Sequence, residues 1–164
     1  LGINVSNNFK KHMQISDVMT RNPVSAMPDS LVTKIALLMN ENRLHAIPVV
    51  NGRNKVVGII TESDFFIKGS MNMYLPSVIE ILKDNSMLDK MPENKKGKIE
   101  KIMETRAGEI MSSPCIALNY EASIDDFFEL VKDKKLHSVP VVDSSHSLVG
   151  IITLADVMNL IKIN

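Results

Sequence analysis

The sequence has little of what several classes of protein require. It holds one cysteine and no tryptophan in 164 residues, which excludes an intrachain disulfide and favours a reducing compartment. Nineteen basic residues balance nineteen acidic ones. This balance argues against nucleic acid as the main partner, because phosphate binding needs a surplus of positive charge. No apolar run approaches the roughly 20 residues that span a bilayer, and Leu1–Asn4 lacks the pattern of a secretory signal. We therefore expect a cytoplasmic protein that binds neither nucleic acid nor membranes.

The sequence also lacks the spacings of common catalytic and cofactor sites. It contains no glycine-rich phosphate loop, no metal-spaced Cys/His cluster and no paired catalytic carboxylates. The single cysteine, Cys115, shows no basic triad partner, and we interpret it as a packing residue. The sequence thus predicts a protein that is not an enzyme, with no catalytic residue, no metal site and no required cofactor.

What the chain does contain is an internal repeat at a constant offset of 92 residues, without a gap. His45–Val50 matches His137–Val142, and Gly58–Thr61 matches Gly150–Thr153. Identical and conservative pairs on both sides of these strings keep the same register. Matches in order along one register indicate a duplicated structural unit rather than a shared composition.

Both copies predict the same order of elements, β-α-β-β-α, preceded by a short helical turn. An amphipathic helix with apolar residues at three- and four-residue spacing follows the first strand. Two strands rich in Val and Ile come next, joined by a polar, turn-prone loop, and a helix closes the copy. The expected ranges in the first copy are Ile15–Met19 (turn), Val24–Ala26, Ala46–Val50 and Val56–Ile60 (strands) and Glu62–Ile67 (closing helix). Those in the second are Ala107–Met111, Ile116–Leu118, Ser138–Val142, Leu148–Ile152 and Leu154–Ile161.

These elements place the chain in the α/β (α+β) class, with helices covering small sheets. About fifty residues bury too little surface for comfortable stability alone. We therefore expect two tandem modules packed with pseudo-twofold symmetry, with a cleft between them where a small ligand binds. The expected organisation is an N-terminal tail (1–14), a first module (15–70), a helical insert (71–106) and a second module (107–164).

The insert predicts two helical stripes separated by a loop. The first stripe follows Pro76, the polar stretch Asp84–Gly97 is typical of a loop, and a second stripe ends near the second copy. The stripe residues are Leu75, Val78, Ile79 and Leu82, then Ile99, Ile102 and Met103. Lysines and glutamates alternate along the second half, which favours a solvated helix face; a surface for a partner is the alternative.

The most informative string is Gly-apolar-apolar-Thr-x-x-Asp, present at Gly58–Asp64 and again at Gly150–Asp156. As a structural motif, the Thr caps a helix and the Asp completes a capping box, an arrangement that contributes about 1 kcal/mol without any ligand. As a binding motif, the same carboxylate accepts hydrogen bonds from two vicinal hydroxyls, such as those of a ribose, and the Thr hydroxyl assists. The residues alone leave both interpretations open.

Taken together, twice and in order, these strings resemble a CBS-domain pair, also called a Bateman module. The matching strings are Asp17–Thr20, Pro23-Val24, Pro28–Ser30, Ile47–Val50 and Gly58–Asp64, then Glu109–Ser112, Val139–Val142 and Gly150–Asp156. The resemblance covers Ile15–Ser70 and Ala107–Ile163. It implies a regulatory module that binds an adenosine-containing ligand (AMP, ADP, ATP or an S-adenosylmethionine-type molecule) in the cleft between the modules. It also implies a homodimer that signals to a partner protein or domain, whose identity the sequence leaves unknown.

The resemblance further implies which residues contact the ligand. The ribose contacts are Thr61, Ser63 and Asp64 in the first copy and Thr153 and Asp156 in the second, where Ala155 replaces the serine. The apolar groups beside the adenine are Val24 and Ile47, or Ile116 and Val139, and backbone groups around Ala46 and Ser138 contact its edge. Because of Ser63, the first copy is the favoured site if only one binds.

His45 and His137 occupy the same repeat position, one residue before a strand. An isolated histidine is most often a structural or surface residue. In a nucleotide-sensing member of the family a histidine at this place contacts phosphate, and the resemblance implies the same role here. Neither histidine is followed by an arginine, since Ala46 and Ser138 stand there, which weakens the expectation of tight polyphosphate binding.

A ligand-free structural dimerisation module is the alternative function. Its candidate contact surfaces are the helices at Phe65–Ile67 and Val157–Ile161. An enzyme is disfavoured, because the chain offers no catalytic constellation.

Overall fold

The computed structural model describes residues 13–67, 80–81, 83–84 and 86–161, and the chain divides into two compact units. Among the described residues, unit 1 combines the segments 13–23, 54–56 and 116–161, and unit 2 combines 24–53 and 57–115. Each unit is therefore assembled from parts of both copies of the repeat.

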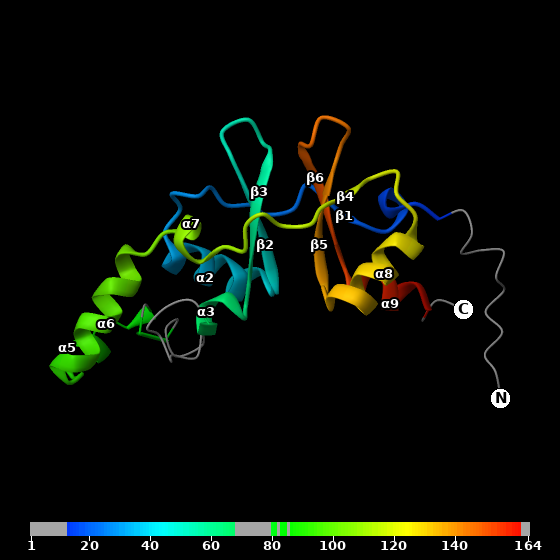
Figure 1. The fold of residues 1–164 in the computed structure, drawn as a ribbon. Coiled ribbons are helices and arrows are strands. Elements are labelled where there is room, and N and C mark those ends of the chain that lie inside the picture. The colour runs from blue at the N-terminus through cyan, green and yellow to red at the C-terminus, as the bar shows by residue number, and fades with distance from the viewer. Residues whose placement is uncertain (1–12, 68–79, 82, 85, 162–164) are drawn as a thin grey trace. The chain divides into compact units, whose positions relative to one another are not determined.

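Unit 2 is built on a two-stranded sheet of β2 (Ala46–Val50) and β3 (Val56–Thr61) (Figure 1). Helix α2 (Val32–Asn42) packs on it through Val32, Ile35, Ala36 and Met39, at the three- and four-residue spacing of one helix face. The helix ends at Arg43, whose left-handed backbone (φ 53°) stops the helical path. Among the described residues, this unit also contains α3 (Asp64–Ile67), α5 (Ser86–Asp89), α6 (Glu93–Glu104) and α7 (Ala107–Ile110).

Unit 1 contains a four-stranded sheet in the order β1-β6-β5-β4. Its strands are β1 (Thr20–Arg21), β4 (Leu118–Asn119), β5 (Ser138–Val142) and β6 (Leu148–Thr153). Strand β6 pairs antiparallel with β1 and β5, and β4 pairs parallel with β5. The described part of this unit also contains the 3-10 turn η1 (Ile15–Asp17) and the helices α8 (Ile124–Lys134) and α9 (Leu154–Ile161). The side chain of Ser123 caps α8, and Lys135 (φ 55°) ends it as Arg43 ends α2.

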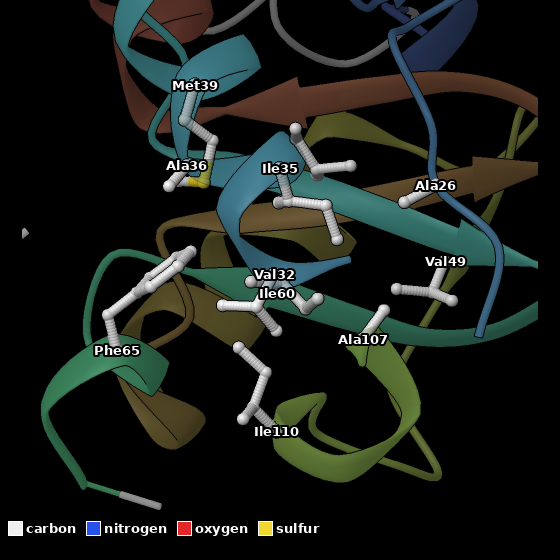
Figure 2. Packing of buried hydrophobic residues seen from close by; sticks show 11 residues of the cluster. Ala26, Val32, Ile35, Ala36, Met39, Val49, Ile60, Phe65, Ala107 and Ile110 are labelled. Atoms are coloured by element: carbon white, nitrogen blue, oxygen red, sulfur yellow. The ribbon is translucent and has the colours of Figure 1, made fainter. Parts of the chain in front are cut away.

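The helical turn that opens each copy packs against the sheet of the other copy. Ile15, from the start of the first copy, is fully buried in the core of unit 1 with Phe127 and Ile152. Conversely, Ala107 and Ile110 of α7 join the core of unit 2, and Figure 2 shows them reaching the cluster that holds Val32 and Ile60. Each core therefore contains residues of the turn that opens the other copy.

Backbone hydrogen bonds fix the same exchange. Thr20 of the first copy lies opposite Ile151 in the β1–β6 pairing. In unit 2 the pair Ile59 and Ser112 exchanges two hydrogen bonds, with N–O distances of 3.2 and 2.9 Å. Pairing of this kind sets the register of each opening segment on its strand.

The loop after β2 contributes a short segment, Asn54–Val56, to unit 1. Asn54 and Leu148 bond in both directions through N–O distances of 2.9 and 3.0 Å. The Lys55 ammonium donates to the carbonyl and the hydroxyl of Ser145 and to the hydroxyl of Ser147. Two loops that the repeat places at equivalent positions are thereby joined.

The structure confirms the α+β class and the two tandem modules, and it corrects several local predictions. The expected strand Val24–Ala26 is reduced to a single parallel bridge between Ala26 and Val49, and the chain bends between β1 and this bridge. The expected loop Asp84–Gly97 contains α5 and the first residues of α6, which begins after Pro92. Most of the stripe around Pro76 lies outside the described residues.

The second stripe of the insert is correct for two of its three residues. Ile99 and Ile102 are 2% exposed, and α6 packs on α2. Met103 is 42% exposed and faces solvent, since it lies one position off the buried face of α6. The amide of Val32 donates to the carbonyl of Thr105 at 2.9 Å, which ties the end of the insert to the start of α2.

Candidate binding sites at the Thr–Asp turns

In the first copy, Thr61 and Asp64 form a closed turn between β3 and α3. The Asp64 carboxylate oxygen Oδ2 accepts hydrogen bonds from the Thr61 backbone N–H at 2.8 Å and from the Thr61 hydroxyl at 3.0 Å. The Thr61 hydroxyl also lies 2.8 Å from that of Ser63. Asp64 is 6% exposed, and a buried carboxylate requires such partners. The three residues expected at the ribose are thus one hydrogen-bonded cluster.

Ser112 completes this cluster, although the sequence analysis did not single it out. Its hydroxyl donates to Asp64 Oδ1 at 3.3 Å. It arrives there because the segment that opens the second copy lies on β3, where a Cβ on Gly58 would approach Met111 Sδ to 2.6 Å and the Ser112 carbonyl to 3.1 Å. The sequence signal was the hydroxyl at the equivalent repeat position, Thr20.

The second copy repeats the turn with Thr153 and Asp156. Asp156 Oδ2 accepts from the Thr153 backbone N–H at 2.8 Å and from its hydroxyl at 2.7 Å. The Asp156 backbone N–H donates back to the Thr153 hydroxyl at 3.3 Å, so the capping-box interpretation is confirmed here. Ribose binding uses the same atoms and stays a prediction.

The two histidines lie directly beside these turns. The backbone carbonyl of His45 accepts from the amide of Glu62 at 3.3 Å, and that of His137 accepts from Leu154 at 2.9 Å. Both histidines are exposed. His45 Nδ1 lies 3.2 Å from Glu62 Oε2, a pair for which the second copy has no equivalent because Leu154 cannot accept a hydrogen bond.

The residues expected at the adenine divide into two groups. Val24 and Ile116 are 37% and 42% exposed, and these apolar side chains are open to a ligand. Ile47 and Val139 are fully buried in the two cores. Contact of these two side chains with an adenine stays a prediction. Among the backbone positions, Ala46 is 7% exposed and Ser138 pairs with Thr153 across β5 and β6.

The described part of the chain shows little evidence of a metal site, a reactive cysteine or a membrane-spanning helix. No group of three His, Cys, Asp or Glu residues there is placed to hold a metal ion. Burial raises the pKa of the Cys115 thiol, which disfavours the thiolate that a nucleophile needs. None of the described helices has both the length and the apolar character needed to cross a membrane.

The family of this chain follows from a comparison with family models. The model of the CBS domain matches residues 15–68 and 107–163. Because these two ranges make up more than half of the chain, the protein belongs to the CBS domain family and carries the domain twice. The resemblance that the sequence motifs suggested is thereby confirmed.

Its relatives include proteins of several lengths. The uncharacterized protein MJ1426 of Methanocaldococcus jannaschii is 28% identical over 158 residues, which cover 89% of both chains. MJ1225 of the same organism is 29% identical over 136 residues, covering 82% of this chain and 44% of its own length. The chloroplastic protein CBSX1 of Arabidopsis thaliana is 26% identical over 138 residues, covering 80% and 56%. The chain thus spans about half the length of the last two.

Solved structures share the fold. The crystal structure of MJ1225 matches with a TM-score of 0.69 and 27% identity, over 91% of this chain and 50% of that one. CBSX2 in complex with AMP matches with a TM-score of 0.65 and 22% identity, over 91% and 96%. The CBS domain pair of MJ0100, in complex with 5-methylthioadenosine and S-adenosyl-L-methionine, matches with 0.62 and 22%, over 92% and 96%.

Proposed function

We propose that this chain is a regulatory module that binds an adenosine-containing ligand at its Thr–Asp turns and transmits the bound state to a partner protein or domain. The observation that carries the proposal is the turn itself. A carboxylate fixed beside a Thr hydroxyl occurs at Thr61–Asp64 and again at Thr153–Asp156, with nearly the same hydrogen bonds. Family membership supports the proposal, as do the adenosine ligands of CBSX2 and MJ0100.

The geometry suits the two neighbouring hydroxyls of a ribose. A carboxylate offers about four acceptor positions on its two oxygens, and the Thr–Asp turn fills those of Oδ2 in both copies. Oδ1 of Asp64 accepts a hydrogen bond from the Ser112 hydroxyl at 3.3 Å. A ribose hydroxyl that donates to this oxygen would form a charge-assisted hydrogen bond, which is stronger than a neutral one.

The other contacts of the ligand follow from the surroundings of the turn. In the proposed binding mode, the exposed Val24 and Ile116 contact the adenine, and the exposed His45 and His137 contact the 5′ substituent of the nucleoside. Contact of the ligand with both modules across a cleft stays a prediction, as do the homodimer and a cytoplasmic location. A regulatory rather than catalytic role is part of the proposal, and it requires that the ligand bind two states of the module unequally.

Titration calorimetry with AMP, ADP, ATP and S-adenosylmethionine tests the proposal directly. Binding of at least one of them is expected, and Asp64→Asn and Asp156→Asn should each weaken one site by about tenfold or more, the usual effect of losing a hydrogen bond to a charged group. Asp133→Asn removes a charge from the exposed face of α8 and should leave binding unchanged. A melting curve of each variant separates lost binding from lost folding.

Absence of binding to all four ligands would overturn the proposal. In that case a melting temperature that is unchanged across the nucleotide panel, together with a dimer seen by light scattering, would favour the structural dimerisation module instead.

A further inference from the structure

The two Thr–Asp turns differ in charge at one position. The residue after the threonine is Glu62 in the first copy and Leu154 in the second. Each of them donates its backbone N–H to the carbonyl of the neighbouring histidine, so the two residues occupy the same place in the fold. The first turn therefore carries two carboxylates, Glu62 and Asp64, where the second carries only Asp156.

The carboxylate of Glu62 also engages the histidine beside it. The His45 Nδ1 and Glu62 Oε2 atoms are 3.2 Å apart, with 77% and 55% of their side chains exposed. A protonated His45 would be neutralised by Glu62, and a neutral His45 leaves the negative charge of Glu62 uncompensated. At the second turn the His137–Leu154 pair is positive or neutral. When the two histidines have the same protonation state, the second turn is one charge more positive than the first.

From this difference we infer that the two sites select ligands by the charge of the 5′ substituent, with Glu62 as the specificity-determining residue. The inference rests on the proposed function. The site at Thr61–Asp64 favours an adenosine ligand without negative charge, such as a nucleoside or a sulfonium nucleoside. The site at Thr153–Asp156 accepts a phosphate-bearing nucleotide.

The reason is Coulombic. A nucleoside monophosphate carries nearly two negative charges at neutral pH, and Glu62 follows directly after the Thr61 that would hold its ribose. For a phosphate roughly 6–8 Å from the Glu62 carboxylate, this repulsion in water would lower the affinity by a factor of about three to ten at low ionic strength. An uncharged nucleoside does not experience it.

The test compares AMP with adenosine at each site. Asp156→Asn isolates the first site and Asp64→Asn isolates the second, and the ratio of the two dissociation constants is measured by calorimetry at low salt. In the Asp156→Asn protein, Glu62→Gln should strengthen AMP binding relative to adenosine binding by about threefold to tenfold. In the Asp64→Asn protein, Leu154→Glu should weaken AMP binding relative to adenosine binding by a similar factor. Both shifts should shrink in 1 M salt, where the screening length is about 3 Å.

Glu100→Gln is the matched control, because it removes one negative charge from an exposed position of α6 in the same unit. It should leave the ratio unchanged. If AMP or adenosine still binds but Glu62→Gln and Leu154→Glu each change the ratio by less than twofold, the charge selection is overturned. The proposed function is not affected by that result. Equal shifts from Glu100→Gln and Glu62→Gln overturn it as well, because they trace the effect to overall charge. Loss of all binding in the wild-type protein overturns both.

Discussion

The hydroxyl of Ser112 donates to the carboxylate of Asp64 over 3.3 Å, although Ser112 stands at the opening of the second copy and Asp64 at the end of the first. The bond joins the two copies of the repeat inside one compact unit. It also places a residue of one copy in the candidate binding site of the other.

Ser112→Ala should lower the free energy of unfolding by about 1 kcal/mol, because a buried carboxylate loses one donor. Urea unfolding followed by circular dichroism measures this change. Ser144→Ala, in the exposed loop between β5 and β6, is the control and should stay within about 0.5 kcal/mol of the wild type. Equal effects of the two substitutions would show that the Ser112 bond adds nothing to stability.

Gly58→Ala should destabilise the protein by about 1–3 kcal/mol, the usual result of overpacking. The added Cβ would approach the Met111 sulfur to 2.6 Å and the Ser112 carbonyl oxygen to 3.1 Å. The sulfur can move away, but the backbone carbonyl is held by the pairing of Ser112 with Ile59. Thermal unfolding of the variant measures the loss.

Gly52→Ala provides the comparison for that substitution, because no atom lies within 4 Å of its added Cβ. We expect its melting temperature to stay close to that of the wild type. A Gly58→Ala variant that melts at the same temperature as Gly52→Ala would contradict the close approach of the Met111–Ser112 segment to β3.

Ile102→Ala should cost about 2–5 kcal/mol, since it removes a side chain that is 2% exposed where α6 packs on α2. Met103→Ala changes the next residue, which is 42% exposed, and should cost well under 1 kcal/mol. Chemical denaturation of both variants decides whether the insert is an integral part of unit 2. Similar losses for the two would argue against the buried face assigned to α6.

Asp143→Asn should reduce stability at neutral pH, and the difference from the wild type should disappear in acid. The hydroxyl of Ser145 holds the pKa of Asp143 below its usual value of 3.8, and the backbone N–H of Ser147 and the Lys55 ammonium act in the same direction. A carboxyl whose folded-state pKa is lowered adds stability above its unfolded-state value, and this stability is lost as the pH falls through the folded-state pKa.

Unfolding curves between pH 7 and pH 2 test this dependence. The gap between the wild type and Asp143→Asn should be complete above about pH 4 and should close below it. Asp133→Asn, on the exposed face of α8, controls for the change in net charge. If the difference in stability between the wild type and Asp143→Asn is unchanged at pH 2, the contribution of Asp143 does not depend on its charge.

Much of the fold was predictable from local sequence. An amphipathic helix follows in each copy as expected, and the strands over Ala46–Val50 and Ser138–Val142 lie where the apolar pattern placed them. Prediction from the local pattern failed in polar segments, where packing elsewhere in the same element determines the structure. Glu93–Gly97 is helical although it is polar and ends in glycine, because Ile99 and Ile102 of the same helix are buried.

Of the candidate site, only the geometry of the two turns was predictable from the sequence. The Thr–Asp turns follow from residues three positions apart, which a chain brings together by itself. Ser112 is 48 residues from Asp64, too far along the chain for a local spacing to link the two. The sequence also did not predict the full burial of Ile47 and Val139. In a short strand that is apolar at every position, alternation does not indicate which face packs on the core.

By itself, the sequence determined the duplication, the elements of each copy and the pair of hydrogen-bonded turns, since each of these depends on residues close in the chain or on a constant register. Only the tertiary structure decided that each opening turn belongs to the other copy's core. A half-formed module gains most by burying whichever apolar turn covers its sheet, and a repeated sequence presents the same turn twice. Whether Ile15 or Ala107 enters a given core therefore depends on packing. A local pattern that occurs in both copies cannot distinguish the two turns.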